Sequence, residues 1–485
     1  MNRPRGRFAS VASVLALTVA AACSAADDGS GVGPDGGDDE EGYSEHDGTG
    51  AGADDGDGPD DNIPNSEDED ELDGADLGAD GDVDPAELAD LDDLSAVPDD
   101  ADPYLEPDDA TALRIAPAAP ALTPGCIAKA TLGGAQAWFH FVRPDAPCRG
   151  EGAGKDRNAI AELVRLIHSV PNDGRIDGHI FNISIDRVAQ ELYNAQKRGV
   201  EVYISTDGQV RNSQDVAKTA YLDRLKHIVY CHQGSNRACI ATGDRAISHT
   251  KLFAFSRATQ PDGTVSNDVV WFGSANQSFG SGTNMFNNTV TVYGADGLYG
   301  DLRHYLGDLY NQKRAGDYFK PDSGRGYIRR GPANVYISPE SETDLITHRL
   351  DDMTPSSGCE VRMMASMIKD NRLAVINRLV KMKQGGCDVR VVAASPEPEA
   401  LKRLKGAGIP VRQARVHDKV FIVHGKFGGS QKYRVFTGSH NIAIGSTRFF
   451  DEIFVKLAPE SGTNHPVYDA YMAHFADAYD DAHPL

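Results

Sequence analysis

Apolar residues cluster in two copies of one pattern along this chain. In the first copy, a polar stretch that contains glycine separates an apolar run at residues 252–255 from a second run at residues 269–272. In the second copy, the corresponding runs occupy residues 420–423 and 433–436. Two short apolar runs on either side of a polar turn are typical of a β-hairpin. The sequence therefore predicts two copies of one module, each with a hairpin.

A strand–helix–strand pattern precedes each predicted hairpin. Before the first hairpin, strands are predicted at residues 179–185 and 200–205, with a helix at 188–195 that a basic turn and Gly199 close. The second copy has a strand at 360–367, a helix at 372–383, glycines at 385 and 386, and a strand at 388–393. A helix before the first copy is predicted from the spacing of Ala159, Leu163, Leu166 and Ile167. Such βαβ units imply parallel strands within an α/β fold.

The two hairpins carry the same polar residues in the same order. H-x-K precedes the first strand and G-S-x-N follows the second, which gives His249, Lys251, Ser274 and Asn276 in one copy and His417, Lys419, Ser439 and Asn441 in the other. Alternate side chains of a strand share a face, so His and Lys two positions apart can grip one ligand. Two such sets that converge on a pseudo-twofold axis suit a phosphodiester, whose oxygens and developing charge the lysines and asparagines would hold.

The paired motifs resemble the signature of the phospholipase D superfamily, H-x-K-x4-D followed by G-S-x-N and present twice. As a pattern, the resemblance extends over roughly residues 150–460. It implies an α/β fold of two α/β/α sandwich modules related by a pseudo-twofold axis, with the active site between them. The chain departs from the signature where Asp is expected five residues after each Lys, because Ser256 and His424 stand there. The tyrosyl-DNA phosphodiesterase branch also lacks this Asp.

The resemblance also implies a role for each motif residue. His249 would attack phosphorus and form a phosphohistidine, and His417 would protonate the leaving group and then activate water. Lys251, Lys419, Asn276 and Asn441 would stabilise the charge of the transition state. We expect no metal or cofactor, because the lysines supply the positive charge that a metal supplies elsewhere. Ser274 and Ser439 are expected to bind phosphate or to hold the loop.

Family members place a carboxylate or an amide in the strand after G-S-x-N, where it holds the far nitrogen of each histidine. The expected partners are Asp451 or Glu452 for His417, and Asn287 or Asn288 for His249. A carboxylate favours the protonated form of an imidazole, which suits an acid, whereas an amide leaves the imidazole closer to neutral and fit for attack. This expected asymmetry supports the roles given above.

The N-terminal part of the chain has a different character. Residues 1–23 have a basic start, a short apolar core at 11–22 and Cys23 at a site that resembles a lipoprotein cleavage site, so we expect an export signal and a lipid anchor. Residues 24–110 contain 34 Asp and Glu and no Lys or Arg. Residues 24–122 are therefore predicted to be a disordered acidic tether, followed by modules at 123–325 and 326–485.

The acidic segment dominates the net charge of −24. Without its 34 acidic residues and the three arginines of the first 23 residues, residues 111–485 have a net charge of +7. Positive charge on the modules is compatible with an anionic substrate or surface, although this excess is mild for the length.

Six further cysteines, an even number in a chain with an export signal, suggest disulfide bonds. Pairing of near neighbours joins Cys126 to Cys148, Cys231 to Cys239, and Cys359 to Cys387. Six cysteines allow fifteen connectivities, so the sequence leaves the others open. The C-x2-C spacing that is typical of zinc sites does not occur in the sequence, so the sequence gives no indication of a zinc site.

These features predict an exported or lipid-anchored phosphodiesterase, expected to be a monomer, that cleaves a phospholipid head group at a membrane surface. A nuclease or nucleic-acid end-processing phosphodiesterase is the first alternative. A catalytically degenerate surface binding protein is the second. Retention of each His and Lys argues against the second alternative, and loss of both signature Asp residues argues mildly for it.

If Cys23 carries lipid, the Cys23→Ser variant should lose both cell association and labelling by a fatty-acid probe, because the thiol is the attachment point. Fractionation of cells that express either form measures this. Unchanged association and labelling would show that Cys23 is not an anchor.

Overall fold

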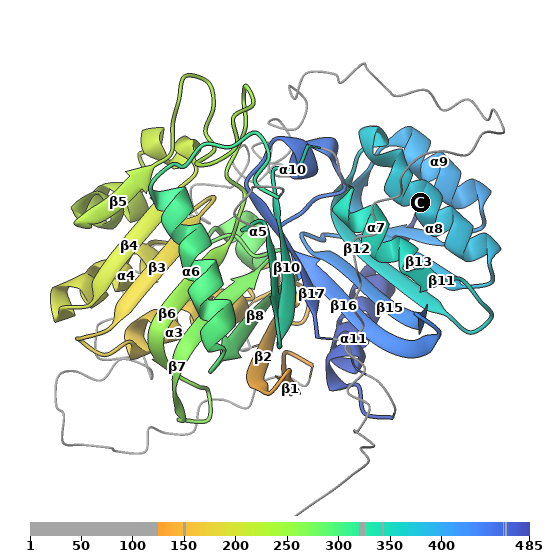
Figure 1. The fold of residues 1–485 in the computed structure, drawn as a ribbon, viewed down its shortest axis with the longest axis horizontal. Helices are drawn as coiled ribbons and strands as arrows, with labels where there is room; N and C mark the ends of the chain where they lie inside the picture. Colours follow the sequence, from red (N-terminus) through yellow and green to blue (C-terminus); the bar gives the residue numbers. More distant parts are fainter. Residues whose placement is uncertain (1–124, 149–151, 320–324, 342–343, 459, 461–462) are drawn as a thin grey trace, which may run out of the picture. The chain divides into compact units, whose positions relative to one another are not determined.

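The computed structural model describes residues 125–148, 152–319, 325–341, 344–458, 460 and 463–485. The predicted export signal, Cys23 and the acidic tether at 24–122 lie outside the described residues. All of the described residues belong to one compact unit. Figure 1 draws the fold and labels its helices and strands.

The first module is built on a sheet of eight strands among the described residues. Their order is β1 (Ile127–Leu132), β2 (Ala135–Val142), β8 (Asn287–Tyr293), β7 (Val265–Gly273), β6 (Leu252–Thr259), β3 (Arg175–Ile180), β4 (Glu201–Thr206) and β5 (His227–Tyr230). The helices are α3 (Asn158–Ser169), α4 (Asp186–Arg198), α5 (Phe279–Thr283) and α6 (Asp296–Tyr310), with short 3-10 or π turns at Gly208–Asn212, Ala217–Tyr221 and Leu222–Arg224.

The second module has a ten-stranded sheet within the described ranges. Its order is β18 (His483–Pro484), β14 (Val411–Gln413), β13 (Asp388–Pro396), β12 (Glu360–Ile368), β15 (Lys419–Phe427), β16 (Ser430–Gly438), β17 (Glu452–Leu457), β10 (Ala333–Ser338) and β9 (Tyr327–Arg330), and β11 (Met353–Thr354) pairs with β15. The helices are α7 (Leu345–Asp351), α8 (Leu373–Gln384), α9 (Pro398–Gly406), α10 (Ile444–Arg448) and α11 (Pro466–Asp481), with a 3-10 turn at Asp370–Arg372.

Both predicted hairpins and both predicted βαβ units are confirmed. Strands β6 and β7 pair antiparallel in the first module, as β15 and β16 do in the second. Strands β3 and β4 are parallel, and so are β12 and β13. The hairpins join these units antiparallel, through β3 with β6 and β12 with β15, so each sheet is mixed.

The predicted strand at 179–185 is wrong at both ends, because β3 spans Arg175–Ile180. The prediction missed the polar start of this strand. Arg175 and Asp177 form an ion pair within β3, so these charged residues can belong to a strand. Beyond Ile180 the chain leaves the sheet, and Ile183 forms only an isolated bridge with Gln277. The apolar residues of this stretch are buried by packing rather than by strand pairing.

Helices cover both faces of each sheet, which confirms the predicted α/β/α layers (Figure 1). In the first module, α3 and α4 bury one apolar cluster and α6 lies against another. In the second, α7, α8 and α9 cover one face, and α11 packs in the cluster that also contains α6. That shared cluster takes residues from both sheets, so burial of apolar surface joins the modules. Among the described residues, no helix is long and apolar enough to cross a membrane.

Three disulfide bonds confirm the predicted pairing. They join Cys126 to Cys148, Cys231 to Cys239, and Cys359 to Cys387. The first fastens the segment before β1 to the one after β2, and the third fastens the start of β12 to the turn before β13.

The glycine of each G-S-x-N motif allows a close approach of two backbones. A Cβ atom on Gly273 would overlap the backbone oxygen of Asn288, and one on Gly438 would overlap that of Ile453. The following serine N–H donates to the same oxygen at 3.0 Å in both copies. The glycines therefore let each motif dock on the strand that follows it.

Replacing either glycine by alanine should destabilise the protein by about 2 kcal/mol or more, the scale of overpacking in a tight site. Urea denaturation of Gly273→Ala and Gly438→Ala measures the loss. Gly300→Ala is the control, because nothing lies within 4 Å of its added Cβ in α6, and it should gain about 0.5–1 kcal/mol. Equal stability of all three variants would contradict the close-approach argument.

Candidate active site

The two H-x-K motifs stand where the first hairpin strand of each module begins. His249 and Lys251 directly precede β6, and Lys419 is the first residue of β15. All four side chains are at most 4 % exposed. In both copies the lysine Nζ donates to the carbonyl oxygen of the histidine two residues earlier, at 2.8 Å. The two motifs thus share one local geometry.

The partners of the two histidines are exchanged relative to the sequence prediction. The expectation of Asp451 or Glu452 behind His417, and of Asn287 or Asn288 behind His249, is wrong. Instead, His249 Nδ1 lies 2.9 Å from Glu452 Oε1 and His417 Nδ1 lies 3.1 Å from Asn287 Oδ1. With the partners exchanged, their asymmetry no longer supports His249 as the nucleophile and His417 as the acid. Each module therefore supplies the partner for the histidine of the other module.

Backbone contacts between the modules explain the exchange. The His417 N–H donates to Phe286 O at 2.9 Å, and the Asp451 N–H donates to Ile247 O at 3.0 Å. These bonds place the start of β8 beside the second H-x-K motif and the start of β17 beside the first. Asn287 and Glu452 occupy equivalent positions, because each is the eleventh residue after the asparagine of its G-S-x-N motif.

Asp451 and Asn288 serve elsewhere. The Asp451 carboxylate accepts backbone N–H groups of Cys239, Ile240 and Ala241 at 2.7–3.0 Å, which ties the loop after β5 to the second module. Burial raises the pKa of this carboxyl despite those hydrogen bonds. Asn288 donates to Asp418 at 2.6 Å.

Glu452 is a buried carboxylate whose charge is compensated. Burial alone would raise its pKa, but the hydrogen bond and electrostatic interaction with His249, together with His440 and Lys251, outweigh burial, and the pKa lies below its ordinary value. The other Oε1 contact is Ser446 Oγ, which donates at 2.9 Å. Glu452 therefore orients the His249 ring through Nδ1 and leaves Nε2 as the nitrogen that would meet a substrate.

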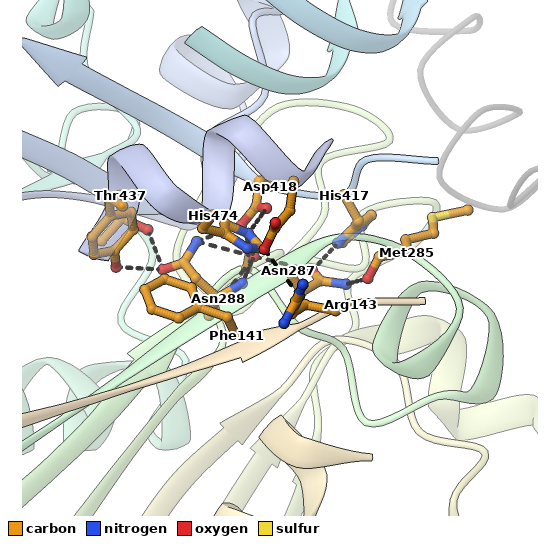
Figure 2. A network of polar contacts seen from close by, with 12 residues as sticks. Phe141, Arg143, Met285, Asn287, Asn288, His417, Asp418, Thr437 and His474 are labelled. Atoms are coloured by element: carbon orange, nitrogen blue, oxygen red, sulfur yellow. Dashed lines mark hydrogen bonds and ion pairs between the residues drawn. The ribbon is translucent and has the colours of Figure 1, made fainter. Parts of the chain in front are cut away.

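His417 lies between an amide and an ammonium group. The Asn287 amide nitrogen donates to the carbonyl oxygens of Ser281 and Met285, so its oxygen must face the His417 ring (Figure 2). His417 Nδ1 consequently carries the proton of that hydrogen bond. Lys419 Nζ lies 3.1 Å from His417 Nε2. The two histidines thus have unlike surroundings in spite of the repeated motif.

The serine and asparagine of each G-S-x-N motif lie in the same region. Ser274 Oγ is 3.0 Å from Asn287 Oδ1, and Ser439 Oγ is 3.5 Å from Ile453 O, so both serines bond to the following strand. Asn276 and Asn441 are 3 % and 4 % exposed, and their side-chain oxygens have no hydrogen-bond partner among the described residues. Buried amides with an unsatisfied half are places where a ligand can complete the hydrogen bonding.

The sequence analysis missed three residues of this region. Phe181 contacts His249 edge-on, with ring centroids 4.5 Å apart, and its face lies 4.7 Å from Lys251 Nζ. Asp418, between the second His and Lys, is fully buried and pairs with His474 of α11 at 2.7 Å. An Asp next to two motif residues was visible as a signal, whereas nothing in the sequence marked Phe181 or His474.

The two positions that lack the signature Asp lie along the strands, away from the motif histidines. Ser256 Oγ accepts the backbone N–H of Arg175 at 2.8 Å, and His424 stacks on Tyr433 with ring centroids 4.2 Å apart. Each follows its motif histidine by seven residues, which corresponds to about 23 Å of extended strand. Neither can touch a substrate held by the histidines.

Comparisons with known proteins agree with this architecture. Residues 352–477 match the family model described as cardiolipin synthase, PLD-like domain. That range covers most of the second module, including its H-x-K and G-S-x-N motifs. The resemblance to the phospholipase D superfamily is thereby confirmed. No curated protein matches the chain.

Several solved structures are similar to the chain. Polyphosphate kinase from Porphyromonas gingivalis is 13 % identical, with coverage of 70 % of this chain and 49 % of that one and a TM-score of 0.43. The phospholipase D family member Nuc from Salmonella typhimurium is 24 % identical, with coverage of 32 % and 97 % and a TM-score of 0.25. Phosphatidylserine synthase from Haemophilus influenzae is 9 % identical, with coverage of 74 % and 90 % and a TM-score of 0.48. The chain spans about half the length of the polyphosphate kinase.

The charge of Glu452 should contribute to stability above its ordinary pKa of 4.5, and this contribution should be lost as the pH falls through its lowered folded-state pKa. The difference in unfolding free energy between wild type and Glu452→Gln should therefore grow as the pH rises from 3 to 6. Chemical denaturation across that range measures it.

Glu340→Gln is the matched control with the opposite sign. Burial raises the pKa of Glu340 to about 8, so its contribution is present at low pH and is lost as the pH rises. The difference between wild type and Glu340→Gln should shrink from pH 3 to 6. If the differences in unfolding free energy changed with pH in the same direction for the two glutamates, this result would contradict the argument that the charge of Glu452 is compensated.

Proposed function

We propose that this phospholipase D-like chain is a phosphodiesterase that cleaves a phospholipid head group through a phosphohistidine intermediate. The observation that carries the proposal is the joining of two His–Lys pairs, one from each module, with histidine partners that cross between the modules. Two imidazoles with fixed Nδ1 partners, each in a motif with a lysine, would supply a nucleophile, an acid and charge stabilisation.

In the first step, His249 Nε2 forms a bond to phosphorus while the bond from phosphorus to the leaving oxygen breaks. His417 Nε2–H gives its proton to that oxygen. Glu452 accepts the Nδ1–H of His249, which fixes the tautomer and compensates the positive charge that the ring gains, as an orienting carboxylate does for other catalytic histidines. Lys251, Lys419 and the amide N–H groups of the two motif asparagines would hold the non-bridging oxygens.

In the second step, a water molecule replaces the alcohol that has left. His417 Nε2 takes a proton from the water, the water oxygen bonds to phosphorus, and the bond from phosphorus to His249 Nε2 breaks. Asn287 supports His417 in both states, because its oxygen accepts the Nδ1–H of the neutral and of the protonated ring. An amide stabilises the cation less than a carboxylate would, which leaves His417 readier to give up its proton.

A phospholipid is favoured as the substrate by the apolar surroundings of His249 and by the charge of the modules. Phe181, Ile247 and Phe450 form a small apolar cluster, against which the half-buried Phe449 packs. Phe181 also touches His249, so apolar groups lie beside the reacting nitrogen. The predicted export signal, the predicted lipid anchor at Cys23 and the net charge of +7 over residues 111–485 are compatible with a substrate at an anionic membrane surface.

Nucleic acid is the second candidate substrate. The observation that favours it is the replacement of both signature Asp residues by Ser256 and His424, a departure shared with the tyrosyl-DNA phosphodiesterase branch. Basic residues of the modules are scattered along the sequence rather than clustered with aromatic residues, which weighs against a dedicated binder of single strands. The lipid therefore remains the proposed substrate.

Head-group release from phosphatidylcholine and phosphatidylethanolamine vesicles, measured beside cleavage of single-stranded DNA, tests the substrate. We expect head-group release that persists in EDTA, since the lysines supply the positive charge. Cleavage of DNA without head-group release, with inhibition that rises steeply with salt, would overturn the lipid proposal.

Variants of the two histidines test the roles. His249→Ala should abolish turnover and any covalent adduct, whereas His417→Ala should slow turnover by about 10²–10⁴-fold and allow the adduct to accumulate. A base-stable phosphate adduct, measured after mixing with labelled substrate, should appear on His417→Ala. His424→Ala, on strand β15 that follows His417, is the control and should keep wild-type activity. An adduct on His249→Ala would refute the assignment of the nucleophile.

A further inference from the structure

A buried polar network lies directly behind the second H-x-K motif (Figure 2). At its centre is Asp418, which precedes Lys419 and follows His417 in the sequence. His474 Nε2 from α11 lies 2.7 Å from Asp418 Oδ2, and Asn288 Nδ2 from β8 donates to Oδ1 at 2.6 Å. Neither Asp418 nor His474 is more than 1 % exposed, so the pair is removed from water.

The surroundings of the pair are fixed on every side. The His474 ring stacks on Phe141, with ring centroids 4.6 Å apart, and meets Phe286 edge-on at 5.8 Å. The amide of Asn288 cannot turn, because Thr437 Oγ1 and Tyr471 OH both donate to its oxygen at 2.8 Å. The Asn288 amide therefore presents its nitrogen to Asp418 in one fixed orientation.

A single hydroxyl links this network to the partner of His417. Ser274 Oγ lies 3.3 Å from Asp418 Oδ1 and 3.0 Å from Asn287 Oδ1. Ser274 Oγ also lies 3.3 Å from Asn288 O. A hydroxyl has one proton, so Ser274 can donate to only one of these three oxygens at a time. When the proton turns to Asp418, the Asn287 oxygen is left to the His417 Nδ1–H alone. The charge of Asp418 thus acts on His417 through Ser274 and Asn287.

We propose that Asp418 and His474 form a positioning pair for His417. The pair pins the second H-x-K motif to the first module and sets how strongly Asn287 holds the imidazole. It touches no substrate and acts only through Ser274, Asn287 and the backbone. The inference rests on the proposed role of His417, but the geometry that it describes can be measured without a substrate.

Because Asp418 and His474 carry opposite charges when ionised, variants of the two residues should change the protonation of His417 in opposite directions. His474→Gln keeps a donor for Asp418 but removes the positive charge that His474 can carry, so Asp418 should favour protonated His417 more strongly. Asp418→Asn removes the negative charge and should favour it less. The titratable groups near these residues include Lys419 at His417 Nε2 and Tyr471, whose hydroxyl reaches Asp418 through Asn288. Figure 2 also labels Arg143 in this network.

Titration of the His417 imidazole by ¹⁵N NMR of the full chain tests the proposal, with the His417 signal assigned by its loss in His417→Ala. We expect the titration midpoint to move upward in His474→Gln and downward in Asp418→Asn, each by about half a pH unit or more. The alkaline limb of the kcat/KM profile, which reports the protonated His417 that the first step needs, should move in the same directions. A shift in the NMR titration without any phosphodiesterase activity would uphold the pair and refute only the proposed function.

Tyr293→Phe is the control for loss of a buried hydrogen bond at the other end of β8, where the Tyr293 hydroxyl meets Arg165 and Glu162. It should lower stability and leave the His417 titration unchanged. If His474→Gln and Asp418→Asn lower stability but also leave that titration unchanged, the pair is structural and the proposal is overturned.

Should either variant fail to fold, Thr437→Val provides a second test, because it removes one of the hydrogen bonds that hold the Asn288 amide. This variant must still shift the titration midpoint of His417, and an unshifted midpoint refutes the proposal.

Discussion

Two hydrogen bonds that cross between the modules hold the site together. Glu452 of the second module orients His249 of the first, and Asn287 of the first orients His417 of the second. Neither module by itself contains both a motif histidine and the residue that hydrogen-bonds to its Nδ1. The shared apolar cluster, which includes residues of α6 and α11, keeps the modules docked, so the same burial that stabilises the fold also assembles the candidate site.

Burial of so many polar groups is costly unless each charge is compensated. Removal of a carboxylate or ammonium from water costs several kcal/mol, and a partner must offset that cost. The Glu452 carboxylate is paired with His249, and the Asp418 carboxylate is paired with His474 and accepts a hydrogen bond from Asn288. In return, charges in a dry site act strongly on one another and on a bound phosphodiester. The enclosed setting of the lysines and histidines is therefore part of their chemistry.

Local patterns predicted much of this structure. The hairpins, the βαβ units and the near-neighbour disulfides depend on residues close together in the sequence, where alternation and turn residues are informative. Within each copy, the lysine and the histidine of H-x-K also share one local arrangement, because they are two residues apart. The strand at 179–185 was misplaced because buried apolar residues such as Ile183 look like strand residues even when they pack outside the ladder.

The partners of the histidines could not be predicted in the same way. Strand alternation shows which face a residue occupies, but not which module's histidine lies opposite that face. The backbone contacts of Phe286 and Asp451 decide the pairing, and they form only when the modules dock. His474 and Phe181 were invisible for the same reason, since their contacts join segments far apart in the sequence.

The equivalent positions of Asn287 and Glu452 bear on how such a site can originate. In a symmetric dimer of identical modules, both positions would have to be the same residue, because each symmetry-related site repeats every side chain. Fusion of the two modules into one polypeptide removes that restriction. The sequences of the two modules can then diverge independently. The two histidines of a pseudo-twofold arrangement can therefore have different partners. The difference between one amide and one carboxylate is thus a property that two identical modules in a symmetric dimer cannot have.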